Sequence, residues 1–170
     1  VLDNYVITSN ISNITNFGFD YISQGTNVNV NTVADLTGIE DFVGLTSLLL
    51  RGQFTSFTLP QSISNLNSLN LSFTPNLTSV TLISQTLQSL SVHMGPPLTT
   101  IDTSNLPNLK SFYNSQISNP SGIRTLDFSN NSEMECISSH SSNLRSINVS
   151  GCSKLNQLAL HNSSDLNGVL

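Results

Sequence analysis

Histidine is the residue whose type and spacing come nearest to chemistry in this sequence. The three histidines, His93, His140 and His161, each occupy the seventh position of a repeated segment. Histidine binds metals and changes its charge between about pH 5 and 8, so an aligned set predicts a ligand-contacting stripe or a weak two-histidine metal site. Solvated histidines along one edge are a third interpretation. Because a selective metal site needs about three or four ligands and no carboxylate shares these positions, we predict no metal and no cofactor.

Two further residues join the histidines as candidates for ligand binding. Arg51 occupies the same seventh position in an earlier copy of the repeat, and Tyr113 lies at a fifth position, among hydroxyl and amide side chains. An exposed aromatic ring beside such groups is a plausible contact for a sugar or a protein. The predicted ligand-binding residues are therefore Arg51, His93, Tyr113, His140 and His161.

Acidic residues line up at the fifth position of other copies, where Asp102 and Asp127 are expected on adjacent coils. A carboxylate pair could indicate a glycosidase or a calcium site, and the alternative is a like-charge pair on a solvated strand. No second acidic cluster, nucleophile motif or phosphate-binding loop accompanies them. We therefore predict no catalytic residue and no enzyme. The register also separates Cys136 from Cys152 by too much for a disulfide, which predicts free thiols.

One pattern organises all of these positions: an apolar residue, two residues, an apolar residue, one residue and another apolar residue. The third position was not used to find the pattern, yet it is Ser or Thr in nine of thirteen copies. A period of two predicts a short strand in each copy, and the intervals are too short for helices. The copies begin at Leu36, Leu45, Phe54, Leu66, Leu77, Leu87, Leu98, Leu109, Ile123, Met134, Leu144, Leu155 and Leu166.

Successive copies alternate between two faces of the expected solenoid. Seven copies, the first of them at Leu36, form face B. The copies on face A lie 21, 21, 22, 25 and 21 residues apart. Two strands in each coil of about 21 residues predict a mainly β solenoid of about six coils, with little or no helix and a length of roughly 29 Å. Face A holds the copies that begin at Leu45, Leu66, Leu87, Leu109, Met134 and Leu155.

The repeat resembles a known family. The segment DLTGIEDFVGLTSL, which begins at Asp35, resembles the entry to bacterial leucine-rich repeat domains, and the LTSLxL and DxSN-type copies resemble the subclass of about 21 residues in secreted bacterial proteins. This resemblance covers about residues 33–170 and implies a leucine-rich-repeat solenoid. The chain departs from the family pattern in lacking a regular Asn after each strand.

The beginning of the chain does not fit the repeat. Residues 1–32 contain the alternating segments Phe17–Tyr21 and Val28–Val30, which predict strands of an N-terminal cap covering the first coil. We expect the solenoid to occupy residues 33–170 and the natural protein to continue beyond Leu170, because Leu166 begins a new copy.

Composition narrows the function. Ser (29), Asn (22) and Thr (16) are abundant, and charged residues are 9% of the chain, against about 25% in a typical domain. Five Lys and Arg residues provide no basic footprint for nucleic acid, and no apolar run reaches the roughly 20 residues of a membrane span. A lysine-poor chain rich in Asn, Ser and Thr favours an extracellular, cell-surface or virion location.

The sequence therefore predicts a non-catalytic recognition or adhesion module that binds a protein or a glycan through its exposed strand face. The alternative is a structural or decoration component of a cell-surface or phage-virion assembly. Neighbouring subunits of that assembly would then be its partners.

Overall fold

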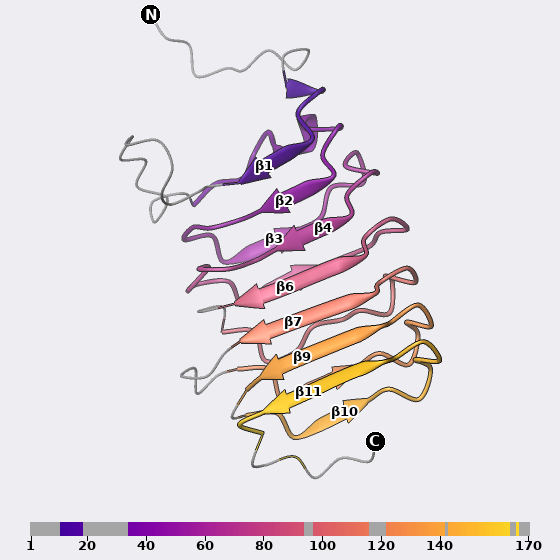
Figure 1. The fold of residues 1–170 in the computed structure, drawn as a ribbon. Helices are drawn as coiled ribbons and strands as arrows, with labels where there is room; N and C mark the ends of the chain where they lie inside the picture. Colours follow the sequence, from indigo (N-terminus) through magenta and orange to yellow (C-terminus); the bar gives the residue numbers. More distant parts are fainter. Residues whose placement is uncertain are drawn as a thin grey trace, which may run out of the picture.

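The computed structural model describes residues 11–18, 34–93, 97–115, 122–141, 143–163 and 166. These residues form a parallel β-solenoid of about five turns, with a spacing of about 22 residues and almost no helix. Figure 1 shows the strands stacked one above the other along the axis of the solenoid. The predicted mainly β solenoid is therefore confirmed, with about five turns in place of the expected six coils.

One side of the solenoid is a continuous sheet, which we call sheet A. Its seven parallel strands follow the order β1-β2-β4-β6-β7-β9-β11. From β2 onward, each strand begins at the third position of a face A copy, and neighbours pair with these positions in register. The predicted register of face A is confirmed. The strands are β1 (Asn16–Gly18), β2 (Ser47–Leu49), β4 (Ser68–Asn70), β6 (Ser89–His93), β7 (Ser111–Ser115), β9 (Cys136–His140) and β11 (Gln157–His161).

The other side, face B, is less regular. It contains two separate pairs of parallel strands, β3 with β5 and β8 with β10. The copies that begin at Leu36 and Leu98 contain no strand, so the prediction of a strand in every copy is wrong for these two. The face B strands are β3 (Ser56–Thr58), β5 (Ser79–Thr81), β8 (Thr125–Asp127) and β10 (Ser146–Asn148).

The copy at Leu36 forms the short 3-10 helix η2 (Ile39–Asp41) in place of a strand. Side chains here form hydrogen bonds with backbone N–H groups that a strand would pair with a neighbouring strand. The Thr37 N–H donates to Asp35 Oδ1 at 2.9 Å, and the Gly38 N–H donates to Glu40 Oε2 at 3.0 Å. Gly38 also has a φ of 94°, which is left-handed and incompatible with an extended strand. None of the helices in the described ranges could span a membrane.

The copy at Leu98 loses its strand because a side chain replaces a backbone donor. On the rest of face B, the N–H of Leu59 or Phe128 donates to the carbonyl of the next coil, at 3.0 and 2.8 Å. At the equivalent position, the Thr103 hydroxyl lies 2.9 Å from the Asp127 carbonyl oxygen. The same hydroxyl lies 2.9 Å from Oδ1 of the fully buried Asn131. Face B is thus interrupted where hydrogen bonds of a buried side chain take the place of a backbone hydrogen bond between coils.

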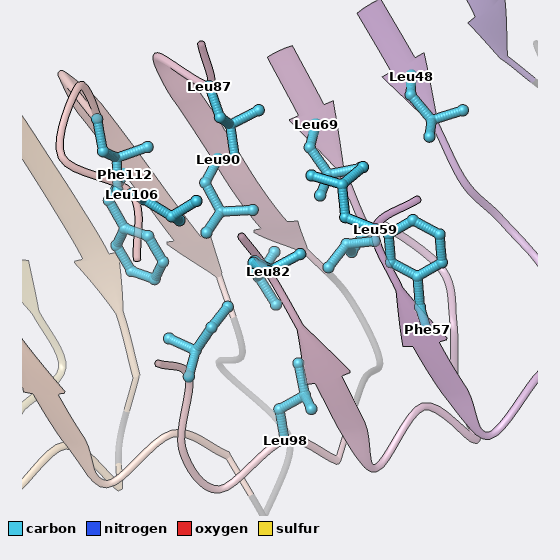
Figure 2. Close-up of a cluster of buried hydrophobic side chains, with 14 of the residues drawn as sticks. Leu48, Phe57, Leu59, Leu69, Leu82, Leu87, Leu90, Leu98, Leu106 and Phe112 are labelled. Carbon is cyan, nitrogen blue, oxygen red and sulfur yellow. The ribbon is translucent and has the colours of Figure 1, made fainter. Parts of the chain in front are cut away.

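The core lies between the two faces and is made of stacked side chains. Leu48, Leu69, Leu90 and Phe112 occupy the fourth position on four successive strands of sheet A, and each is at most 1% exposed. Figure 2 shows these side chains directed toward residues of face B such as Phe57. Burial of one such side chain contributes about 1.5–3 kcal/mol. The stack therefore holds the coils in register.

The N-terminal region contributes one strand that can be compared with its prediction. The β1 strand pairs in parallel with β2 and extends sheet A, and the Phe17 ring packs on Phe42 with centroids 4.8 Å apart. The backbone approaches so closely there that a Cβ on Gly44 would lie 2.3 Å from the Ser12 carbonyl oxygen. The predicted strand at Val28–Val30 lies outside the described residues.

Candidate functional site

The predicted histidine line is real in the structure. The register pairs His93 with Ser115, Ser115 with His140, and His140 with His161. The three histidines are the last residues of the five-residue strands β6, β9 and β11, so they lie at the arrowheads in Figure 1. We name the residues at the seventh position of the face A copies the seventh-position row. Its members are Arg51, Ser72, His93, Ser115, His140 and His161.

The closest contact in this row is between two histidines. The His140 and His161 rings stack with centroids 4.2 Å apart and planes 11° from parallel. A ring nitrogen binds a metal through a lone pair in the ring plane, and two nearly parallel planes point their lone pairs side by side. The stacked rings therefore do not converge on one metal ion. The described residues also contain no cluster of three or more His, Cys, Asp or Glu with metal-binding geometry.

His93 lies two coils away from His140, across the small side chain of Ser115. Burial lowers the pKa of His93, and the nearby positive charge that His140 can carry lowers it further. The described residues provide no carboxylate at a seventh position that would act in the opposite direction. The neutral form of His93 is therefore favoured at this place in the row.

The other end of the row contains Arg51, which pairs with a residue that sequence reasoning missed. The Arg51 guanidinium lies 4.6 Å from the centroid of the Phe73 ring, within the range of a cation–π contact. Phe73 is 41% exposed and has a φ of 58°, which is unusual for a bulky residue. Its N–H donates to the His93 carbonyl at 3.1 Å, and its carbonyl accepts from Gly52 N–H at 3.3 Å. Neighbouring coils thus hold this exposed ring in a strained conformation.

Tyr113 lies on the same outer face, two residues before the row. It pairs with Ser91 on one side and Ser138 on the other, and it is 38% exposed. Its hydrogen bond with Cys136 raises the pKa of the Tyr113 hydroxyl. The structure therefore brings Tyr113 onto the sheet that carries the row, although the tyrosine lies about 7 Å from it along the strand.

The two predicted free thiols are confirmed. Cys136 is partly exposed on β9, and Cys152 is buried. The Cys152 thiol donates to the Phe128 carbonyl at 3.3 Å. Burial raises the pKa of the Cys152 thiol, with a smaller contribution from the charge of Asp127. This cysteine is packed as a small core residue.

The acidic residues of face B have a local structural role. Asp102 Oδ1 accepts the Ser104 N–H, and Asp127 Oδ1 accepts the Ser129 N–H, each at 2.9 Å. Hydrogen bonds from these serines lower the pKa of both carboxyl groups. Asn148 makes the same bond to the Ser150 N–H at 3.1 Å. Because an amide serves equally well at this position, the carboxylates act as turn-forming acceptors.

Charge is distributed unevenly between the row and its surroundings. The two ion pairs in the described part of the chain are Lys110 with Glu135, at 3.8 Å, and Lys154 with Glu133, at 2.6 Å. Neither includes Arg51, and the Arg51 Nε is buried without a hydrogen-bond partner. Arg51 is therefore a cation of the row that no described carboxylate neutralises.

Comparison with known proteins adds no assignment to this geometry. Neither the protein-family models nor the curated proteins compared with the sequence match the chain.

Proposed function

We propose that this chain is a non-catalytic recognition module that binds a protein or a glycan through the outer face of sheet A. The observation that carries the proposal is the composition of that face. Its fifth positions are in register across four neighbouring strands and carry Asn70, Ser91, Tyr113 and Ser138. These are hydroxyl and amide groups around one exposed aromatic ring, with no charged side chain among them.

Such a face suits recognition for physical reasons. Hydroxyl and amide groups both donate and accept hydrogen bonds, so they match sugar hydroxyls or peptide groups equally well. Tyrosine and arginine are enriched among the residues that dominate interface energetics, and Tyr113 and Arg51 lie on this side of the molecule. The rigid stack of coils beneath them would reduce the entropy lost on binding.

We also propose that the solenoid is of the leucine-rich-repeat type and acts outside the cytosol, on a cell surface or a virion. The support is the repeat itself, because its third position begins every sheet A strand from β2 to β11. The abundance of Ser, Asn and Thr, with only two lysines, supports the location.

The experiment is a binding screen with two matched variants. Labelled protein is applied to immobilised cell-surface glycans and extracellular proteins. Ser91→Arg places a bulky charge at a fifth position in the middle of sheet A, and Thr81→Arg does the same at a fifth position of face B. We expect a ligand whose binding is lost in Ser91→Arg and retained in Thr81→Arg. Equal retention in both variants would contradict a binding role for sheet A.

One observation favours the second candidate, a structural role in an assembly. Leu158 occupies the fourth position of β11 and is 37% exposed, whereas Leu90 and Ile137 at the same position are fully buried. An apolar side chain that is exposed at a core position offers a contact to a neighbouring subunit. Light scattering across a concentration series tests this role. A monomer at all concentrations contradicts it, and growth that Leu158→Lys abolishes supports it.

A further inference from the structure

We propose that the seventh-position row, together with Phe73, binds a negatively charged polysaccharide that lies across the strand ends of sheet A, more tightly at acidic pH. This inference rests on the proposed recognition function and specifies its ligand class. The observation behind it is that one arginine and three histidines share one position of the face A copies, and that a strained, exposed aromatic residue contacts the arginine.

The charges of the row complement those of an anionic ligand. The chain has ten acidic residues against five Lys and Arg, yet every residue of the row is neutral or basic. The nearest ion pair on sheet A, Lys110 with Glu135, lies just before β7 and β9. It is about 16 Å away along the strands, which exceeds the Debye length of about 8 Å at physiological salt. The row therefore combines the positive charge of Arg51 with three groups that become positive on protonation, in a molecule that is acidic as a whole.

Arg51 is held by its neighbours in a way that suits an anionic ligand. The guanidinium rests on the Phe73 ring at 4.6 Å, and its Nε is buried without a partner. Arginine recognises carboxylate and sulfate oxygens with two parallel hydrogen bonds, and a guanidinium held against a ring is already oriented for this contact. The positive φ of Phe73 is independent support, since strained residues cluster at ligand sites.

The row is extended along the stack of coils. His93, Ser115, His140 and His161 are paired in register, which spaces them by about 4.8 Å for each step, and Arg51 and Ser72 occupy the same repeat position in the two preceding copies. A ligand that contacts Arg51 and His161 together must be extended and must carry repeated negative charges. Ser115 lies within the row and Ser91 and Ser138 lie beside it, and their hydroxyls match sugar hydroxyls. An acidic peptide would more readily pair with a strand edge than lie across the strand ends.

The three histidines of the row make anion binding depend on pH. The stacked His140 and His161 rings lie 4.2 Å apart at one end of the row, and burial and the charge of His140 lower the pKa of His93. A bound anionic group favours the protonated form of a neighbouring imidazole, so binding is coupled to proton uptake. Besides the row itself, the titratable groups on this face of the packed strands are Tyr113, Cys136 and the Lys110–Glu135 pair.

The test uses calorimetric titration of the whole chain at pH 5.5 and 7.5. The probes are polygalacturonate for carboxylates, dextran sulfate for sulfates, uncharged dextran, and poly-L-glutamate for an acidic protein. Three protonated histidines would change the formal charge from −5 to −2, so the chain stays negative and polyanion binding reports a local site. We expect at least one anionic polysaccharide to bind at pH 5.5, with proton uptake, and about fivefold or more weakly at pH 7.5. The preferred probe identifies the anion.

Variants locate the site. Arg51→Gln and the pair His140→Gln with His161→Gln should each weaken binding about fivefold or more. Arg124→Gln is the matched control, because it removes the same charge from exposed face B. Arg51→Lys should give an intermediate affinity, since it keeps the charge but loses the planar fork. Circular dichroism of each variant checks that the β-solenoid is retained.

Several outcomes would overturn the inference: no anionic polysaccharide binding at pH 5.5, equal affinity at both pH values, or equal loss in Arg124→Gln. Tighter binding of poly-L-glutamate would overturn it in favour of an acidic protein partner. The recognition function would survive any of these results if the ligand screen still finds a ligand sensitive to Ser91→Arg. Both proposals fail only if that screen also shows no dependence on sheet A.

Discussion

Sheet A and face B are built from the same six-residue pattern, but only sheet A is continuous. Its strands β6, β7, β9 and β11 contain five residues, whereas every strand of face B contains three. The fifth position accounts for part of this difference. The strands β4, β8 and β10 end at Asn70, Asp127 and Asn148, whose side chains accept the N–H two residues later. A strand reaches the seventh position only where the fifth residue makes no such turn, and the histidines lie on strands of that kind.

The largest expected effect is on the free energy of unfolding, because sheet A buries its core side chains more completely than face B does. Leu69 is fully buried between two neighbouring coils of sheet A, and Val80 on face B is only partly buried. Leu69→Ala should lower the free energy of unfolding by about 2–5 kcal/mol, and Val80→Ala by about 1 kcal/mol. Urea denaturation measures both. Equal losses would show that the two faces contribute equally to the core.

The polar interruption of face B should be nearly as sensitive. The Asn131 amide donates to the carbonyls of Thr103 and Leu106, at 3.0 and 2.7 Å. Asn131→Ala leaves these buried acceptors without a donor, which should cost about 2–3 kcal/mol in unfolding free energy. Asn130→Ala, at the exposed neighbouring position, is the control. A loss smaller than that of the control variant would contradict a structural role for the network.

Backbone spacing on face B gives a third test. A Cβ on Gly151 would lie 1.9 Å from the Ser129 carbonyl oxygen of the preceding coil, so the two coils approach closely even after their strands end. Gly151→Ala should destabilise the protein by about 1–3 kcal/mol, as measured by thermal unfolding. An unchanged melting temperature would mean that the face B coils can separate without cost.

The smallest effect concerns acid stability. The serine hydrogen bonds hold the pKa of Asp127 below its unfolded value, so the ionised form favours the folded state. This stability is present above the unfolded pKa of about 3.9 and is lost as the pH falls through the lower folded value. Asp127→Asn should leave stability at pH 7 nearly unchanged and reduce its decline below about pH 4. Urea titrations at pH 7 and pH 3 provide the measurement, and an unaltered decline would contradict it.

The sequence predicted the solenoid and the histidine line because both follow from periodicity. Once one copy is in register, a period of two fixes which side chains face outward, and His93, His140 and His161 share one phase of it. The Phe73 conformation was not predictable, since it depends on Gly52 and His93 from neighbouring coils. The break in face B was missed for the same reason, because the partner of Thr103 lies 28 residues away.

Because the coils of sheet A are stacked, each coil adds one residue to the seventh-position row. Each step of 21 residues between β2, β4 and β6 advances the row by one side chain, without altering the phase of those that follow. Deleting residues 68–88 would therefore remove one place from the row and leave the coils on either side in register. For a polymeric ligand, each coil offers one more contact, so the affinity should rise with the number of coils. The length of the chain, more than the chemistry of any single residue, would then set the strength of attachment.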